Sequence, residues 1–314
     1  MSTFFISDFT PFYILEFTFW LFPVASSLDM LKLSRMCINN QLTKLGTARN
    51  MDRNPSEKNY SLNYYFLLVF VLSVPLWLVG VTKLPLPVNL PVSSLTAFIP
   101  MIAALILSSR QSGSQGVKEL FQTAWDYQKI KNKVWYLPIL LLPPLLYMIS
   151  LIIMWQTERP LPDPIKIPFL WLPVYLVMYL ITGTGEELGW SGYATQPMQR
   201  RWGALRASFL LGILWAVWHS IPFVQTQSPV AWVIWQSIKT VAMRMLIVWI
   251  YNQSGKSVFA AILFHTADNV SWSLFPNDGS HYDPMLMGLI NCVVLIIVII
   301  AGGFNGMTRF RGKG

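Results

Sequence analysis

The sequence of 314 residues is poor in charged residues and in cysteine, and it has only three histidines. Charged residues make up 12% of the chain and hydrophobic residues 54%, whereas a soluble globular domain carries about 25% charged residues. This composition argues against an ordinary soluble domain. The two cysteines, Cys37 and Cys292, are too few for a disulfide framework and match no metal-binding spacing. We also find no internal repeat and no low-complexity tract.

The hydrophobic residues occur in long runs rather than at the spacing of an amphipathic helix or strand. Each run has roughly 17–22 residues, the length that crosses a bilayer core as a helix. Such runs must be helical because backbone polar groups find no water partner in lipid. The sequence therefore predicts an all-α fold, a polytopic transmembrane helix bundle. About eight spans are predicted, at 64–82, 94–109, 135–155, 167–188, 207–224, 230–250, 258–275 and 285–303.

The basic residues predict how these spans are oriented. If the segment before the first span is cytoplasmic, most of the 23 lysines and arginines fall in inside segments. The outside loops then hold only Lys83, Arg159 and Lys166. This asymmetry follows the positive-inside rule and predicts a cytoplasmic C-terminus. We attribute the net charge of +9 to orientation against anionic lipid rather than to nucleic-acid binding, for which no motif is present.

Residues 4–28 are rich in aromatic residues, but acidic residues and prolines interrupt them. No basic region precedes them, unlike in a standard signal peptide. They could form an interfacial segment or a ninth span, or translation could instead start at Met51. Four parts are expected along the chain: an N-terminal cytoplasmic or interfacial segment at 1–60, the first transmembrane helices at 61–165, a functional core at 166–275, and the last transmembrane helix with a basic cytoplasmic tail at 276–314.

Ionisable side chains inside lipid cost several kcal/mol each, so they rarely persist there without a role. The predicted spans contain few of them, and the fourth, fifth and seventh spans hold most. Glycines in and after the fourth span, at 183, 185, 189 and 192, are expected to let neighbouring helices approach closely. The polar residues of these three spans are Glu186 and Glu187, then His219, then His265, Asp268 and Asn269.

A carboxylate, two imidazoles and an amide that meet in a dry bundle suggest chemistry on a carbonyl group. The carboxylate and one imidazole can orient and deprotonate a water molecule. The other imidazole and the amide can donate hydrogen bonds to the developing oxyanion. His265 and Asn269 are four residues apart and share a helix face, as this role requires. Each residue alone has an ordinary explanation, since a single intramembrane histidine or asparagine more often packs or bonds to a neighbouring helix.

These segments resemble the CAAX protease and bacteriocin-processing family, also called the Abi family of intramembrane proteases. Its motifs are E-E-x-x-x-R, then F or W-x-x-x-H, then H-x-x-x-N, on successive membrane helices. The resemblance covers the chain from about residue 170 to 275, with the motifs in the same order. The matching residues are Glu186 with Glu187, Trp215 with His219, and His265 with Asn269.

The resemblance implies a role for each matching residue. Glu186 would activate water as the general base, His219 would orient that water, and Glu187 would be a supporting or alternative acidic group. His265 and Asn269 would line the oxyanion site. Two histidines and a glutamate could also ligate Zn²⁺ with an open fourth position, but the H-E-x-x-H spacing is absent. We therefore favour a metal-free mechanism, with zinc as the alternative cofactor.

The chain departs from the family pattern at one position. Ser191 stands where the first motif has arginine, which would anchor the acidic pair. Arg244 in the sixth predicted span is a candidate substitute, but the preferred interpretation is that it snorkels to the cytoplasmic interface. Lys239 lies deeper and has no predicted partner. The predicted fourth span ends near the glutamates, which places them close to the cytoplasmic end, whereas the histidines lie deeper in the membrane. The side chains can meet only if the fourth helix continues past residue 190, which we expect.

The sequence thus predicts an integral membrane endopeptidase of bacterial type, acting on a peptide or membrane-protein substrate near the cytoplasmic face. Bacteriocin-related precursors are among the expected substrates. One alternative is a non-catalytic immunity or scaffold protein on the same fold, which Ser191 supports. A second is a proton-coupled transporter in which Glu186, His219 and Asp268 relay protons. Such a transporter predicts inverted repeats, which the sequence does not have.

Overall fold

The computed structural model describes residues 62–80, 82 and 91–304, which lie in one compact unit, Lys58–Gly314. All regular secondary-structure elements of the described residues are helices, which confirms the predicted all-α fold. The predictions for residues 1–60, including an interfacial segment, a ninth span and a start at Met51, lie outside the described residues. The same holds for the basic residues of the C-terminal tail.

Each predicted span corresponds to a helix, and a short helix, α7, is added after the fourth span. The α-helices of the described residues are α3 (Leu62–Leu78), α4 (Ile99–Thr123), α5 (Tyr136–Gln156), α6 (Leu172–Glu187), α7 (Gln196–Trp202), α8 (Ala204–Gln225), α9 (Val230–Gln253), α10 (Val258–Ser273) and α11 (Pro284–Ile300).

Five helical segments are long and apolar enough to cross a membrane, so the protein is an integral membrane protein. The apolar helices α3 and α11 are shorter, at 17 residues each. Helix α10 has 16 residues and carries the buried polar side chains of His265 and Asp268. The membrane-crossing segments are Val92–Thr123, Lys133–Gln156, Phe169–Trp202, Ala204–Gln225 and Val230–Gln253. Eight crossings remain a prediction.

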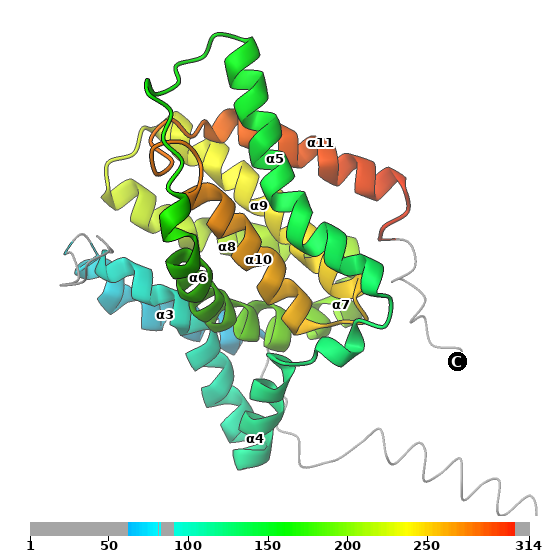
Figure 1. Ribbon diagram of the computed structural model, residues 1–314. Coiled ribbons are helices and arrows are strands. Elements are labelled where there is room, and N and C mark those ends of the chain that lie inside the picture. The colour runs from blue at the N-terminus through cyan, green and yellow to red at the C-terminus, as the bar shows by residue number, and fades with distance from the viewer. Residues whose placement is uncertain (1–61, 81, 83–90, 305–314) are drawn as a thin grey trace, which may run out of the picture. The chain divides into compact units, whose positions relative to one another are not determined.

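Helices α9 and α10 form the interior of the bundle. Helix α10 packs against α5, α6 and α9, and in Figure 1 it runs between α5 and α6. Helix α9 also packs against α8 and α11, and residues 242–248 of α9 are all buried. Polar side chains on these two helices therefore face other helices rather than lipid.

The second predicted span is longer than expected, because α4 continues to Thr123 instead of ending near residue 109. It is interrupted at Ser112 and Gly113, where φ of Gly113 is +61°, so two helical pieces meet at a kink. The hydropathy pattern located only the apolar piece. The polar piece that follows packs beside the π-helical segment described below.

The fourth helix extends past residue 190, as predicted. Helix α6 passes into a π-helical segment, η5 (Leu188–Thr195), and then into α7, which ends at Gly203. The hydroxyl of Thr195 donates a 2.8 Å hydrogen bond to the carbonyl of Trp190, five residues earlier. Insertions of this kind inside α-helices are frequent at functional sites.

Close packing holds this extended helix against the chain around α4. A Cβ atom on Gly189 would lie 2.4 Å from backbone atoms of Pro100, and one on Gly185 would lie 2.8 Å from the carbonyl oxygen of Ala97. Gly183 is less restricted, since its Cβ would lie 3.3 Å from the Thr266 hydroxyl and 3.7 Å from the carbonyl oxygen of Ile262. The predicted role of these glycines in close helix approach is confirmed most clearly at Gly185 and Gly189.

The loops meet at the two ends of the bundle as the charge pattern predicts. Asp126, between α4 and α5, accepts hydrogen bonds from the hydroxyl of Ser257 and from the backbone N–H groups of Val258 and Phe259 at the start of α10. At the opposite end the backbone N–H of Lys166 donates to the Asn277 side chain. Figure 1 shows the α5–α6 and α10–α11 loops together at the top and the α9–α10 turn at the other end.

Candidate active site

The two adjacent glutamates at the end of α6 are both buried, with Glu186 6% and Glu187 0% exposed. Neighbouring residues on a helix point about 100° apart, so the two carboxylates contact different helices. Glu186 meets α8, whereas Glu187 meets α9 and α10. The helix lies inside the bundle here, and each carboxylate therefore finds its own set of partners.

The carboxylate of Glu187 is held from three segments at once. Nη1 of Arg244 donates to its Oε2 over 2.8 Å, and Nδ1 of His265 lies 2.9 Å from its Oε1. The hydroxyl of Ser191, one turn further along the chain, donates to the same Oε2. Both oxygens are thus engaged, and Glu187 ties together η5, α9 and α10.

The carboxylate of Glu186 has fewer partners. Nε1 of Trp215 on α8 donates to its Oε2 over 2.7 Å. Nε2 of His219, one turn further along α8, lies 3.9 Å from the same oxygen, which is too long for a direct hydrogen bond. Oε1 of Glu186 makes no hydrogen bond to any described residue, so this oxygen can accept a proton or bind water.

His219 is oriented by its own helix. Its Nδ1 lies 3.0 Å from the carbonyl oxygen of Trp215, so Nδ1–H donates there and Nε2 of the neutral ring is an acceptor. The rings of Trp215 and Trp218 contact the imidazole edge to face, at centroid distances of 4.8 and 4.7 Å. The His219 side chain is 28% exposed, so the site is accessible on this side.

The preferred interpretation of Arg244 from the sequence is wrong. The side chain does not snorkel to an interface, because it is completely buried and bonds to Glu187. Its guanidinium carbon also lies 3.9 Å from the centroid of the Trp215 ring, a cation–π contact. The Nε and Nη2 groups of Arg244 have no hydrogen-bond partner among the described residues.

The structure brings the two glutamates together with His219 and His265, whereas the side chain of Asn269 makes no hydrogen bond to them. Its side chain is partly exposed and makes no hydrogen bond to a described residue. The preceding residue, Asp268, forms a buried 2.6 Å ion pair with Lys239. Lys239 therefore has the partner that the sequence did not identify, and this pair is separate from the ion pair of Arg244 with Glu187.

The described residues include no group of three or more histidine, cysteine or acidic side chains arranged to hold a metal ion. The zinc alternative requires at least three such ligands. The side chains in the described part of the chain therefore do not fit the zinc site that the sequence left as an alternative.

Two residues near the carboxylates make contacts that the sequence did not predict. Trp215 belongs to the matching motif but has no role assigned there, and its N–H donates to Glu186. Ser191 stands in place of the motif arginine, and its hydroxyl donates to Glu187. The available signal was the i, i+4 spacing, which puts Trp215 on the face of His219 and Ser191 on the face of Glu187.

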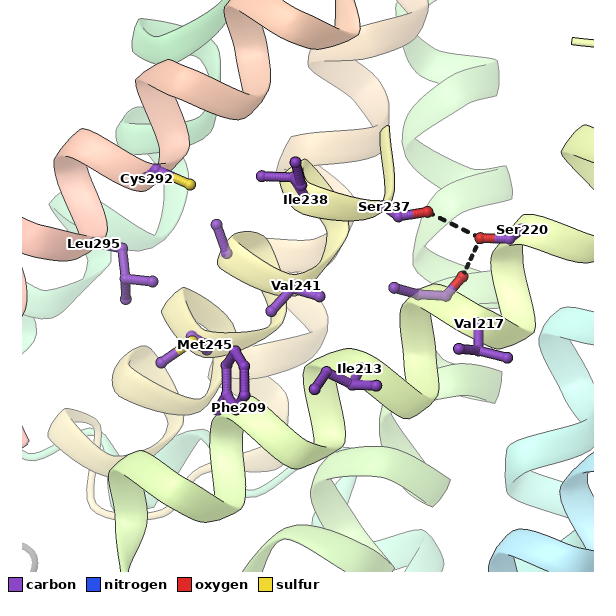
Figure 2. Close-up of a pocket in the computed structure, with 12 residues that line it drawn as sticks. Phe209, Ile213, Val217, Ser220, Ser237, Ile238, Val241, Met245, Cys292 and Leu295 are labelled. Carbon is purple, nitrogen blue, oxygen red and sulfur yellow. Dashed lines mark hydrogen bonds between the residues drawn. The ribbon is translucent and has the colours of Figure 1, made fainter. Parts of the chain in front are cut away.

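An apolar pocket of about 560 Å³ lies elsewhere, between α8, α9 and α11, as Figure 2 shows. Apolar side chains such as Phe209 and Val241 line it, and the hydroxyls of Ser220 and Ser237 bond to each other at its edge over 2.9 Å. No predicted site residue lines this pocket. Helix α8 thus presents one stripe to the polar cluster and a neighbouring stripe to the pocket.

Comparison with known proteins gives two matches. A family model described as type II CAAX prenyl endopeptidase Rce1-like matches residues 168–271, which include all five predicted site residues. CAAX prenyl protease 2 of Methanococcus maripaludis is 27% identical over 176 residues, which are 52% of this chain and 63% of that relative. The chain thus covers less than two thirds of the relative's length. Residues 168–271 are thus similar to the type II CAAX prenyl endopeptidases, which supports the resemblance to the CAAX protease and bacteriocin-processing family.

Proposed function

We propose that the protein is an intramembrane endopeptidase that hydrolyses a peptide bond with a water molecule activated by Glu186. The observation that carries this proposal is the difference between the two carboxylates. Glu187 has both oxygens engaged, whereas Oε1 of Glu186 makes no hydrogen bond to a described residue and Nε2 of His219 is close by. Glu186 is therefore the carboxylate that can act as a general base.

A water molecule between Glu186 and His219 would be well oriented for attack. Nε2 of His219 lies 3.9 Å from Oε2 of Glu186, too far for a direct hydrogen bond, and we propose that a water lies between Nε2 and the open Oε1. Both atoms are acceptors, so the water donates its two hydrogens to them and directs a lone pair at the carbonyl carbon. Glu186 takes a proton as the C–O bond forms, and returns it to the amine as the C–N bond breaks.

The oxyanion that forms in this reaction needs donors. The side-chain amide of Asn269 makes no hydrogen bond to a described residue and can supply one. His265 uses Nδ1 for Glu187, so it can donate through Nε2 only as an imidazolium. Glu187 then acts on the reaction through His265 rather than by touching the substrate.

The substrate is proposed to be a peptide or membrane protein, cleaved near the cytoplasmic face with the C-terminus of the enzyme on that same side. The matching family and the archaeal relative are both named for CAAX prenyl proteolysis. A farnesylated peptide with a C-terminal CAAX sequence is therefore the first probe. Bacteriocin-related precursors are a second substrate class to test.

The test uses the purified full chain in detergent with the farnesylated peptide, in oxygen-18-labelled water. The wild-type protein should release the C-terminal fragment and incorporate the label into the new carboxylate, detected by mass spectrometry. Glu186→Gln removes the base without changing its size and should lower the rate about 10²- to 10⁴-fold. Glu119→Gln, on the exposed part of α4, is the matched control and should cleave normally. Equal rates for Glu186→Gln and wild type would exclude this mechanism.

A further inference from the structure

We propose that Arg244 is a positioning residue of this site, and that it supplies from α9 the guanidinium that Ser191 does not provide on η5. The inference deepens the proposed function, because it explains how a chain without the motif arginine can hold its two glutamates. It rests on that function only where catalytic rates are concerned.

The first argument is charge. Arg244 and Glu187 are both completely buried, in helices that cross the membrane. A buried charge without a partner is strongly destabilising, so neither side chain is tolerated there alone. Serine at position 191 contributes a hydroxyl donor but no charge, so Arg244 is the cation that neutralises Glu187.

The second argument is that Arg244 is connected to both glutamates, to Glu187 directly and to Glu186 through Trp215. It bonds directly to Glu187, which in turn bonds to His265. Its guanidinium also stacks on Trp215 at 3.9 Å, and the N–H of that tryptophan bonds to Glu186. A planar guanidinium can donate along its edge and stack through its face at the same time, whereas a lysine ammonium cannot.

The third argument is that Arg244 carries more donors than its partners use. Its Nε and Nη2 groups are buried and have no hydrogen-bond partner among the described residues. Buried donors are normally satisfied, and an exception calls for an explanation. A purely structural arginine would be expected to use all its N–H donors, whereas Arg244 leaves two groups open while it contacts Glu187 and Trp215.

The fourth argument concerns space. The Ser191 hydroxyl and Nη1 of Arg244 donate to the same oxygen of Glu187, so the two side chains approach one carboxylate from different helices. An arginine at position 191 could reach Glu187 one turn back along its helix. It would then compete with Arg244 for the same volume. Arginine at either position should therefore serve, but not arginine at both.

This predicts that an arginine introduced at position 191 can replace Arg244. Arg244→Ala should unfold at a much lower temperature and lose activity, and Ser191→Arg with Arg244→Ala should recover most of both. We expect the double variant to regain at least about tenfold in kcat over Arg244→Ala, equivalent to one hydrogen bond to a charged group. Thermal unfolding is followed by tryptophan fluorescence in detergent, and cleavage with the farnesylated peptide. A double variant no better than Arg244→Ala in both measurements overturns the proposal.

Arg244→Lys separates positioning from stability. Because the charge remains, the unfolding temperature and KM should change little. The kcat should fall about tenfold, because lysine lacks the guanidinium face that contacts Trp215 and the planar set of N–H donors. Wild-type kcat in Arg244→Lys would contradict the positioning role. Ser191→Arg with Arg244 retained is the control: arginine then stands at both positions, so the unfolding temperature should fall below that of the wild type. If the wild type cleaves no peptide, the proposed function fails, while rescue of folding still decides whether Arg244 replaces the motif arginine.

Discussion

At the scale of single residues, Trp215 connects the two carboxylates. Its N–H holds Glu186 and its ring face holds Arg244, which bonds to Glu187. The i, i+4 spacing to His219 could be read from the sequence, but the partners of the indole could not. They depend on the rotation of α8 relative to α6 and α9, which only the packed bundle defines.

Trp215→Phe should therefore lower kcat/KM without unfolding the protein. Phenylalanine keeps an aromatic face for Arg244 but lacks the N–H that donates to Glu186. A hydrogen bond to a charged group is worth about 1.5–3 kcal/mol, so we expect a decrease of roughly tenfold to a hundredfold with the farnesylated peptide. Trp218→Phe removes an N–H that bonds instead to Ser73 and is the matched control. A larger loss in Trp218→Phe would argue against this role of Trp215.

At the scale of elements, the segment from α6 through η5 to α7 carries the acidic pair. The continuation of this segment past residue 190 is expected from the sequence, because the glutamates must lie as deep in the membrane as the histidines. Its π-helical form could not be predicted, because the extra residue per turn leaves no hydropathy signal. The glycines at 185 and 189 were visible in the sequence, but their partners, Ala97 and Pro100, became known only from the structure.

Gly189→Ala should destabilise the bundle far more than Gly183→Ala. A methyl group at Gly189 would lie 2.4 Å from the backbone of Pro100, which cannot turn aside. Overpacking of this kind costs about 1–3 kcal/mol or more. At Gly183 the nearest atom is a side-chain hydroxyl at 3.3 Å and the nearest backbone atom lies at 3.7 Å, and alanine favours the helix. Thermal unfolding of the two variants checks this, and equal midpoints would show that the close contact is unimportant.

At the scale of the whole molecule, the distribution of basic residues predicts which end of the bundle faces the cytoplasm. The loop that contains Asp126 lies against the start of α10, and the loop that contains Lys166 lies against Asn277. The loops that the charge pattern assigns to the cytoplasmic side therefore lie together at one end of the bundle, and those assigned to the outside lie together at the other end.

Single cysteines introduced in a variant without Cys37 and Cys292 test the orientation. Lys131→Cys should react with a membrane-impermeant maleimide only from the cytoplasmic side, because its loop carries the excess of basic residues. Lys166→Cys and Asp278→Cys should react only from the opposite side. Labelling of intact cells and of inverted vesicles distinguishes the two. Reaction of Lys131→Cys and Lys166→Cys from the same side would refute the predicted arrangement.

The sequence by itself determined the class of fold and the approximate positions of the predicted spans, and it located the polar residues that meet at the candidate site. Hydropathy and charge are sums over neighbouring residues, and the motif spacings are short, so all three can be read along the chain. Only the tertiary structure decided which carboxylate remains open and which cation neutralises the other. Arg244 and Glu187 are 57 residues apart, and their contact depends on how three helices rotate and pack, because burial leaves each charge no stable alternative to the other.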